Sequence, residues 1–177
     1  MCFGRVLRKL KDYENALLFY QKALAIFKEI LPENHELLVI SFSDIAEVFK
    51  DMEDWSSELP FYKKSLEIAL KRYPSDHYNL SKLYSSVATM YQTLEDYSSG
   101  LPFHEKALEI LQKIRPSNNA ELFAAYIHIS GIYFKLGEDS TGMLFVERAI
   151  ELQPESLPED HPFQILRQHF ASLREKS

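Results

Sequence analysis

Four prolines stand at a constant separation along this chain: Pro32, Pro74, Pro116 and Pro158 each lie 42 residues from the next. Other columns obey the same step, namely Phe19, Phe61, Phe103 and Phe145; Lys22, Lys64, Lys106 and Arg148; Ala23, Ser65, Ala107 and Ala149; Leu24, Leu66, Leu108 and Ile150; and Ile26, Ile68, Ile110 and Leu152. No insertion or deletion interrupts this register. A fixed period of this length predicts a tandem repeat in which each unit is one supersecondary structure.

Each unit carries two helical patterns. The first, helix A, is expected at roughly 35–51, 77–93 and 119–135, where apolar residues recur in steps of four and three and so keep to one helix face. The second, helix B, is expected at roughly 12–31, 54–73, 96–115 and 138–153. The short connections make neighbouring helices antiparallel, so the sequence predicts an all-α fold built from helix pairs.

Polar residues mark the expected helix starts. Each of the first three B helices follows an aspartate, Asp12, Asp54 or Asp96, whose carboxylate can accept hydrogen bonds from free backbone N–H groups. The periodic prolines end helix B because proline lacks the N–H that the helix needs. A short polar residue after each proline is expected to cap the next helix A, and these residues are Asn34, Asp76, Asn118 and Asp160.

The pattern predicts a single domain over 1–177. Its repeats span about 1–34, 35–76, 77–118 and 119–160, and a capping helix follows over 161–177. The first repeat would have a truncated helix A, because Met1 aligns with Ser43. One helix pair cannot bury both sides of its apolar stripe, so the units must stack to offset the entropy lost on ordering them.

Two features depart from the repeat's own regularity. Small residues occupy the expected crossing of helices A and B in three units, at Ala16, Gly100 and Gly142, but Glu58 stands there in the other. Pro60 and Pro102 also fall inside the B pattern, so we expect a bent or frayed first turn in those two helices.

The order of core residues resembles the tetratricopeptide repeat. It is carried by Tyr84, Val87, Ala88, Tyr91, Leu94, Asp96-Tyr97, Phe103 and Ala107. The 42-residue period, the turns Asp76-His77 and Asp160-His161-Pro162, and the segment 106–110 are similar to the longer kinesin-light-chain variety. The resemblance implies a right-handed superhelical array of about four repeats whose concave face is lined by helix A. It also implies binding to another protein or peptide.

The chain differs from relatives of this kind at groove positions. Where kinesin-light-chain-like repeats often carry an Asn-Asn pair, this chain has Ser43-Asp44, Ser85-Ser86 and Ile127-His128. The clamp by which chaperone-binding relatives hold a peptide carboxylate is also absent, and the matching positions are Ser43, Glu47, Ser86, Ala124 and His128. We therefore expect no binding of acidic C-terminal tails by that route.

Charge, cysteine content and the lengths of the apolar runs argue against nucleic-acid binding, secretion and membrane insertion. The formal net charge is −6 and no cluster of Lys or Arg is evident, which argues against nucleic acid as a partner. Cys2 is the single cysteine, no signal-peptide pattern occurs near Met1, and no apolar run is long enough for a membrane span. We therefore expect a cytoplasmic protein without a membrane partner.

No catalytic, metal or cofactor site is predicted. His35, His77 and His161 recur at the repeat period, so whole helix pairs separate them and they are expected to be turn residues rather than ligands of one metal ion. His104 and His128 are isolated in the sequence, and the glycines form no phosphate-binding motif. The chain is therefore expected not to be an enzyme.

The remaining candidate site is the surface of helix A beside the core stripe. Its residues are Ile40, Ser43, Glu47 and Lys50; Lys82, Ser85, Thr89 and Gln92; and Ala124, Ile127, Gly131 and Phe134. An extended peptide or a helix could bind along this row, which makes a protein-interaction adaptor the first hypothesis. The alternatives are an assembly module that forms a homodimer through an uncovered first repeat, near Val6, Leu7, Leu10 and Tyr13, or the recognition arm of a larger protein such as a motor-cargo adaptor.

Overall fold

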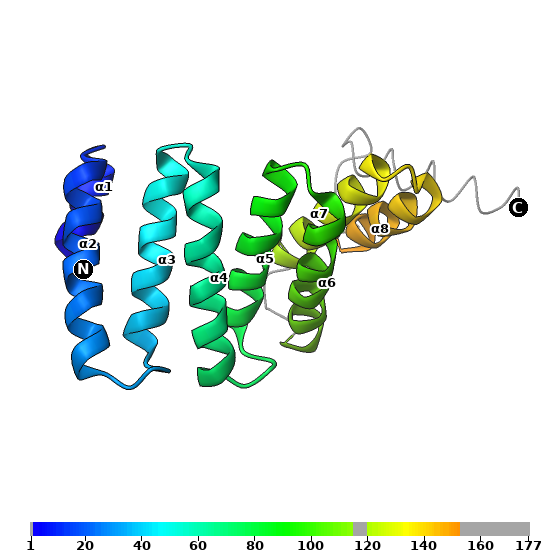
Figure 1. Cartoon of the computed structure of the whole chain (residues 1–177). Coiled ribbons are helices and arrows are strands. Elements are labelled where there is room, and N and C mark those ends of the chain that lie inside the picture. Colours follow the sequence, from blue (N-terminus) through cyan, green and yellow to red (C-terminus); the bar gives the residue numbers. More distant parts are fainter. Residues whose placement is uncertain (1, 115–119, 153–177) are drawn as a thin grey trace, which may run out of the picture.

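The computed structural model of the chain describes residues 2–114 and 120–152. Its helices are α1 (Cys2–Lys9), α2 (Tyr13–Ile30), α3 (Glu36–Asp51), α4 (Trp55–Arg72), α5 (Tyr78–Thr93), α6 (Tyr97–Ile114), α7 (Ala120–Lys135) and α8 (Asp139–Glu151). Consecutive helices form antiparallel pairs that stand side by side in an elongated array (Figure 1). The all-α prediction is confirmed, and so are the expected helix ranges to within a residue or two. The predicted capping helix over 161–177 lies outside the described residues.

The predicted aspartate caps at the start of helix B are confirmed. The Asp12 carboxylate accepts from the backbone N–H of Asn15 at 3.4 Å. The equivalent bonds at Asp54 and Asp96 are both 3.2 Å long. Each cap satisfies a donor that has no partner inside its own helix.

The predicted caps at the start of helix A are wrong at Asn34 and Asp76. The caps there are the next residues, His35 and His77, whose Nδ1 atoms each accept from a backbone N–H two residues ahead at 3.1 Å. The reason is the turn after the proline: the N–H of His35 bonds the carbonyl of Pro32 at 2.9 Å, and this leaves Asn34 inside the turn. The other two expected caps, Asn118 and Asp160, lie outside the described residues.

The turn from helix A to helix B has a recurring left-handed residue that the sequence pattern did not predict. Lys11, Glu53, Glu95 and Gly137 have φ values of 61°, 58°, 58° and 78°. Around Glu53, the N–H of Asp54 bonds the carbonyl of Phe49 and the N–H of Glu53 bonds that of Lys50, both at 3.0 Å. This is the Schellman arrangement, which normally favours glycine at the left-handed position.

The expected fraying at Pro60 and Pro102 is not observed. Helices α4 and α6 run continuously through these prolines, and their first turns close with bonds from Glu58 to Asp54 and from Gly100 to Asp96, both 3.1 Å. The aspartate cap holds the turn ahead of the proline. Each proline is exposed and removes only one hydrogen bond from its helix.

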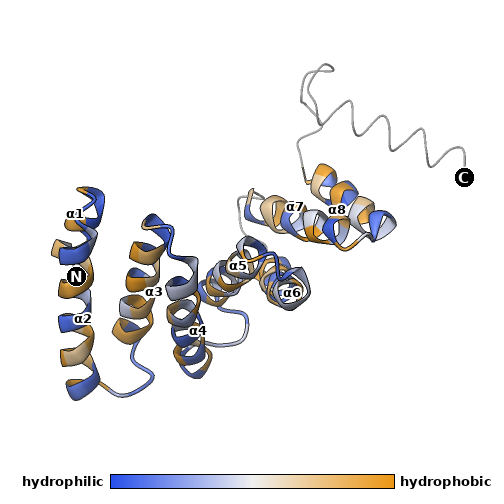
Figure 2. Ribbon diagram, turned by 45° about the horizontal axis from the view of Figure 1, so that its top comes forward, coloured by the Kyte–Doolittle hydropathy of each residue, from blue (hydrophilic) through white to orange (hydrophobic). Residues whose placement is uncertain are grey.

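The core repeats with the period of the sequence. Ile45, Val87 and Ile129 occupy one helix A column and are each 0% exposed. The buried residues form two clusters, one extending from α2 to α6 and the other from α6 to α8. Figure 2 shows the α7–α8 pair beyond α5–α6 at the far end of the array. Among the described residues, no helix is both long and apolar enough to cross a membrane.

Candidate peptide-binding groove

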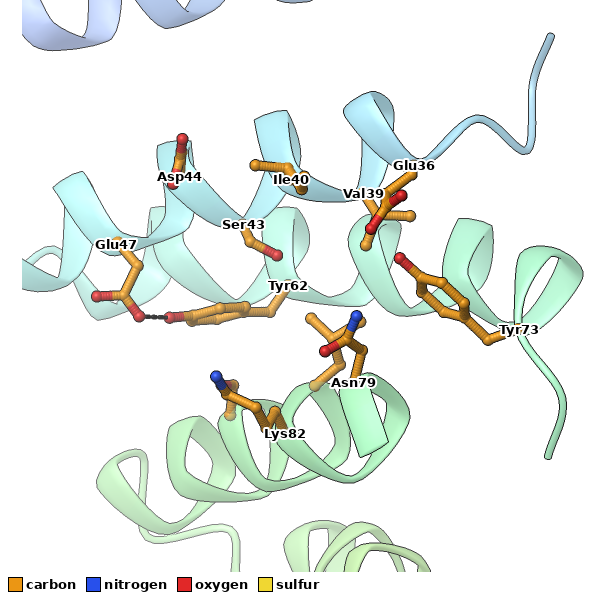
Figure 3. A pocket seen from close by; sticks show the side chains of 12 residues that line it. Glu36, Val39, Ile40, Ser43, Asp44, Glu47, Tyr62, Tyr73, Asn79 and Lys82 are labelled. Atoms are coloured by element: carbon orange, nitrogen blue, oxygen red, sulfur yellow. Dashed lines mark hydrogen bonds between the residues drawn. The ribbon is translucent and has the colours of Figure 1, made fainter. Parts of the chain in front are cut away.

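A first cavity lies between α3 and α5, over the side of α4 (Figure 3). Its volume is about 310 Å³. Its lining residues are Glu36, Val39, Ile40, Ser43, Asp44 and Glu47 from α3, Tyr62 from α4 with Tyr73 at its end, and Asn79, Lys82, Leu83 and Ser86 from α5. Side chains of α3 and α5, the A helices of two successive repeats, therefore provide most of the wall.

The α3 wall of this cavity is acidic and is held in place by its neighbours. The Tyr62 hydroxyl donates a hydrogen bond to Glu47 (Figure 3). Arg8 of α1 forms ion pairs with Glu47 at 3.5 Å and with Asp51 at 3.0 Å. Burial raises the pKa of Asp44, against the opposing effect of Arg5 and Arg8. Lys82 is the cation on the opposite wall.

A second cavity lies between α5 and α7, and its volume is about 290 Å³. Its lining residues are Tyr78, Ser81, Lys82, Ser85, Ser86, Thr89, His104, Leu111, Glu121, Ala124, Ala125 and His128. It shares Lys82 and Ser86 with the first cavity, so the two adjoin along α5. At its rim the Tyr78 hydroxyl bonds Glu121, and the ammonium group of Lys82 lies 5.7 Å from the centre of the Tyr78 ring.

The two histidines that are isolated in the sequence meet in this second cavity. The rings of His104 and His128 stack with centroids 5.3 Å apart. His104 is 1% exposed, and burial together with the neighbouring His128 lowers its pKa to about 4. Burial also lowers the pKa of His128. Both rings are therefore neutral at pH 7. Within residues 2–114 and 120–152, no three His, Cys, Asp or Glu residues gather in a way that could hold a metal ion.

The structure places seven of the twelve predicted groove residues in these cavities. Ile40, Ser43 and Glu47 line the first, Ser85, Thr89 and Ala124 line the second, and Lys82 lines both. The other five, Lys50, Gln92, Ile127, Gly131 and Phe134, line neither cavity.

The prediction missed one complete column, Asp44, Ser86 and His128. The resemblance contained a signal for it, because these are the second members of the pairs Ser43-Asp44, Ser85-Ser86 and Ile127-His128. The helix A residues that line the two cavities therefore lie slightly to one side of the predicted row of groove residues. Lys50, Gln92 and Phe134 come one turn after Glu47 and its equivalents, close to the end of helix A.

A separate apolar surface lies on the first repeat. Phe3 is 58% exposed, although the residues at its position in the next three repeats are 0% exposed. Val6 is 51% exposed, whereas Val48, Met90 and Ile132 in the same column are at most 3% exposed. Of the residues predicted here, Val6 and Leu10 are exposed, while Leu7 and Tyr13 pack against the core.

Comparisons with known proteins agree with this architecture. Residues 1–71 and residues 123–156 each match the tetratricopeptide repeat family. Together the two matches cover more than half of the chain. No curated protein matches the chain.

Several solved structures share the fold at low sequence identity. The TPR-like repeats of a Podospora anserina protein described as a kinesin light chain are 17% identical, with a TM-score of 0.78, over 94% of this chain and 79% of theirs. BtubC (BKLC) from P. vanneervenii is 19% identical, with a TM-score of 0.77, over 88% of this chain and 65% of its own. Apo RapI is 18% identical, with a TM-score of 0.73, over 97% of this chain and 50% of its own. The helix pairs, their 42-residue register and these matches agree: the chain belongs to the tetratricopeptide repeat family and has kinesin-light-chain-like structural relatives.

Proposed function

We propose that this chain is a protein-interaction adaptor that binds a peptide or a helix of its partner in the groove formed by α3, α5 and α7. Tetratricopeptide repeats are generally protein-interaction scaffolds and are typically non-catalytic. The observation that carries the proposal is the pair of adjoining cavities along successive A helices, with Lys82 and Ser86 common to both. A continuous row of this kind suits a ligand that runs across several repeats.

The chemistry of the groove changes along its length. Carboxylates of α3 dominate the first cavity, whereas hydroxyl groups, alanines and neutral imidazoles line most of the second. A ligand that crosses both would therefore meet a charged wall at one end and a largely uncharged one at the other. Such a gradient fixes the direction in which a peptide binds, because charged groups select register and orientation.

The test uses bulky, charged substitutions at exposed groove positions. Ile40→Arg and Ala124→Arg each place a long cation in one cavity at an exposed position. Their matched controls are Ile26→Arg and Ala25→Arg, which make the same changes at exposed positions of α2. Glu47 is avoided because it holds both Arg8 and Tyr62.

Affinity capture from a cell extract with the four variants then decides between surfaces. We expect both groove variants to lose the partners that the wild-type chain and both α2 variants retain. Partners kept by Ile40→Arg and Ala124→Arg, with circular dichroism unchanged, would contradict a groove site.

A second candidate is self-association through the apolar face of α1. The residues that share a column with Phe3 or Val6 are buried in the later described repeats, whereas Phe3 and Val6 themselves are exposed. Another copy of the chain can cover this face in a two-fold dimer. We expect a concentration-dependent dimer by light scattering that Val6→Glu abolishes and Leu70→Glu, at an exposed position of α4, does not. A monomer at all concentrations would exclude this candidate.

A further inference from the structure

The crossing of α3 and α4 contains a buried carboxyl group. Glu58 is 0% exposed, and it occupies the column in which the other repeats have Ala16, Gly100 and Gly142. Gly100 shows how close such a crossing is, because a Cβ atom there would lie 3.0 Å from Cβ of Tyr91 and 3.2 Å from the carbonyl oxygen of Ala88. In the second repeat, a full glutamate side chain is enclosed at the corresponding place.

Glu58 has no hydrogen-bond partner for either carboxylate oxygen within the described part of the chain. The charged groups that act on it all belong to α3: Lys50 favours its ionised form, whereas Glu47 and Asp51 disfavour it. An ionised carboxylate that is enclosed without a partner is strongly disfavoured relative to the neutral acid. The packed crossing therefore favours the neutral acid.

The α3–α4 crossing is connected to the groove wall by a hydrogen bond. Tyr62, one helical turn after Glu58 on α4, donates to Glu47, which lines the first cavity. Arg8 of α1 holds Glu47 and Asp51 together on the other side. From α5, which packs against α4, Ser86 lines the same cavity as Tyr62. A charge on Glu58 would thus repel the two carboxylates that Arg8 and Tyr62 hold in place.

We propose that the α3–α4 crossing is a proton-controlled joint: Glu58 is protonated when the two helices are closely packed, and loss of this proton loosens the crossing and the groove wall of Glu47 and Tyr62. The proposal does not depend on which ligand the groove binds. It concerns a residue that lines neither cavity, and its test needs no partner.

The direction of the pH effect follows from burial. Desolvation raises the pKa of Glu58 from an ordinary 4.5 to about 7 in the folded chain. A group whose pKa is higher in the folded state stabilises the fold fully below its unfolded pKa, and this contribution is lost as the pH rises through the folded pKa. The second repeat is therefore tight near pH 5 and looser near pH 8.

The single tryptophan is a native reporter of this joint. Trp55 lies three residues before Glu58 on α4, so the two share one side of the helix, and it packs against the core. We expect the fluorescence of the folded protein to change sigmoidally between pH 5.5 and 8.5, with a midpoint near 7. The change should be absent in Glu58→Gln and unaltered in Glu14→Gln, a control at an exposed position of α2.

Two further variants separate the joint from a general pH effect. Glu47→Gln removes a charge that disfavours ionisation of Glu58, so the midpoint should move to lower pH. Lys50→Gln removes the charge that favours ionisation of Glu58, so the midpoint should move to higher pH. A titration that persists in Glu58→Gln, or shifts of the opposite sign in these two variants, would overturn the proposal.

Urea unfolding provides an independent measure. Between pH 5 and pH 8 the unfolding equilibrium constant of the wild type should rise at least tenfold more than that of Glu58→Gln, since one unit of pKa shift corresponds to a factor of ten. If Glu58→Gln does not fold, carboxyl ¹³C NMR of the wild type gives the pKa directly. A Glu58 signal that titrates near 4.5, the ordinary value for glutamate, would overturn the proposal.

Discussion

The second repeat (α3–α4) and the third (α5–α6) share their turns but differ in their interiors. Glu53 and Glu95 have the same left-handed φ of 58°, and the caps of Asp54 and Asp96 have the same length of 3.2 Å. At the helix crossing, however, the second repeat encloses a carboxyl group and the third has Gly100.

The same contrast extends into the groove. In the second repeat, the Tyr62 hydroxyl reaches Glu47. In the third repeat the equivalent of Tyr62 is His104, whose Nε2 has no hydrogen-bond partner in the described structure. These two repeats thus share the hydrogen bonds that end and start their helices, while the polar groups between their helices differ.

The largest expected effect comes from giving the third repeat the residue of the second. Gly100→Glu forces a side chain against Tyr91 and the Ala88 carbonyl, so we expect a loss of at least ~3 kcal/mol in the free energy of unfolding, measured with urea. Gly131→Glu is the control, because a Cβ atom on that helical glycine meets nothing within 4 Å. The control should stay within about 1 kcal/mol of the wild type. Equal losses in both variants would show that the α5–α6 crossing at Gly100 is no more restrictive than an open helix position.

Removing the inter-helix polar group should lower stability in the second repeat much more than in the third. Tyr62→Phe deletes the donor to Glu47 and should cost about 1.5 kcal/mol of stability in urea unfolding. His104→Leu removes a buried nitrogen that lacks a partner, so we expect no loss beyond ~0.5 kcal/mol. A greater loss for His104→Leu than for Tyr62→Phe would contradict this difference between the second and third repeats.

The helix caps should be equally important in the two repeats. Asp54→Ala and Asp96→Ala each remove one cap and should lower Tm by about 3 °C in a thermal scan by circular dichroism. Hydrogen bonds from Ser57 and Ser56 lower the pKa of Asp54, so its contribution is present above an ordinary pKa of 3.8 and is lost as the pH falls below it. If the loss of Tm differed clearly between the two variants, the two caps would not be energetically equivalent despite their equal hydrogen-bond lengths.

The smallest expected effect concerns the left-handed turn residues. Glu53→Gly and Glu95→Gly relieve a backbone conformation that side chains disfavour, at the cost of a more flexible unfolded chain. We expect each to raise the unfolding free energy by about 0.5 kcal/mol, and Gly137→Ala, at the same column, to lower it by a similar amount. The effect of each variant is measured from its midpoint of urea unfolding. A change of stability with the same sign in all three variants would contradict the shared turn geometry.

Much of the fold could be read from the sequence because its signals are local. The period placed every described helix, the aspartates before helix B identified real caps, and the column of small residues marked the crossings. The groove was harder to predict. Helical spacing predicted a row through Ile40, Ser43, Glu47 and Lys50, and the first three of these line a cavity together with Asp44, which the row omitted, whereas Lys50 does not.

The repeat, its helices and the residues that face the core can be derived from the sequence alone, because they follow from periodicity and from interactions within a few residues. Four contacts became evident only from the three-dimensional packing: His35 caps α3, His104 stacks on His128, Arg8 pairs with two carboxylates of α3, and Glu58 is enclosed. Most of these contacts join different helices, and even the His35 cap depends on how the turn after Pro32 closes. Their geometry is set by the direction of each side chain and by how closely neighbouring helices approach, neither of which is encoded in the spacing of residues along one helix.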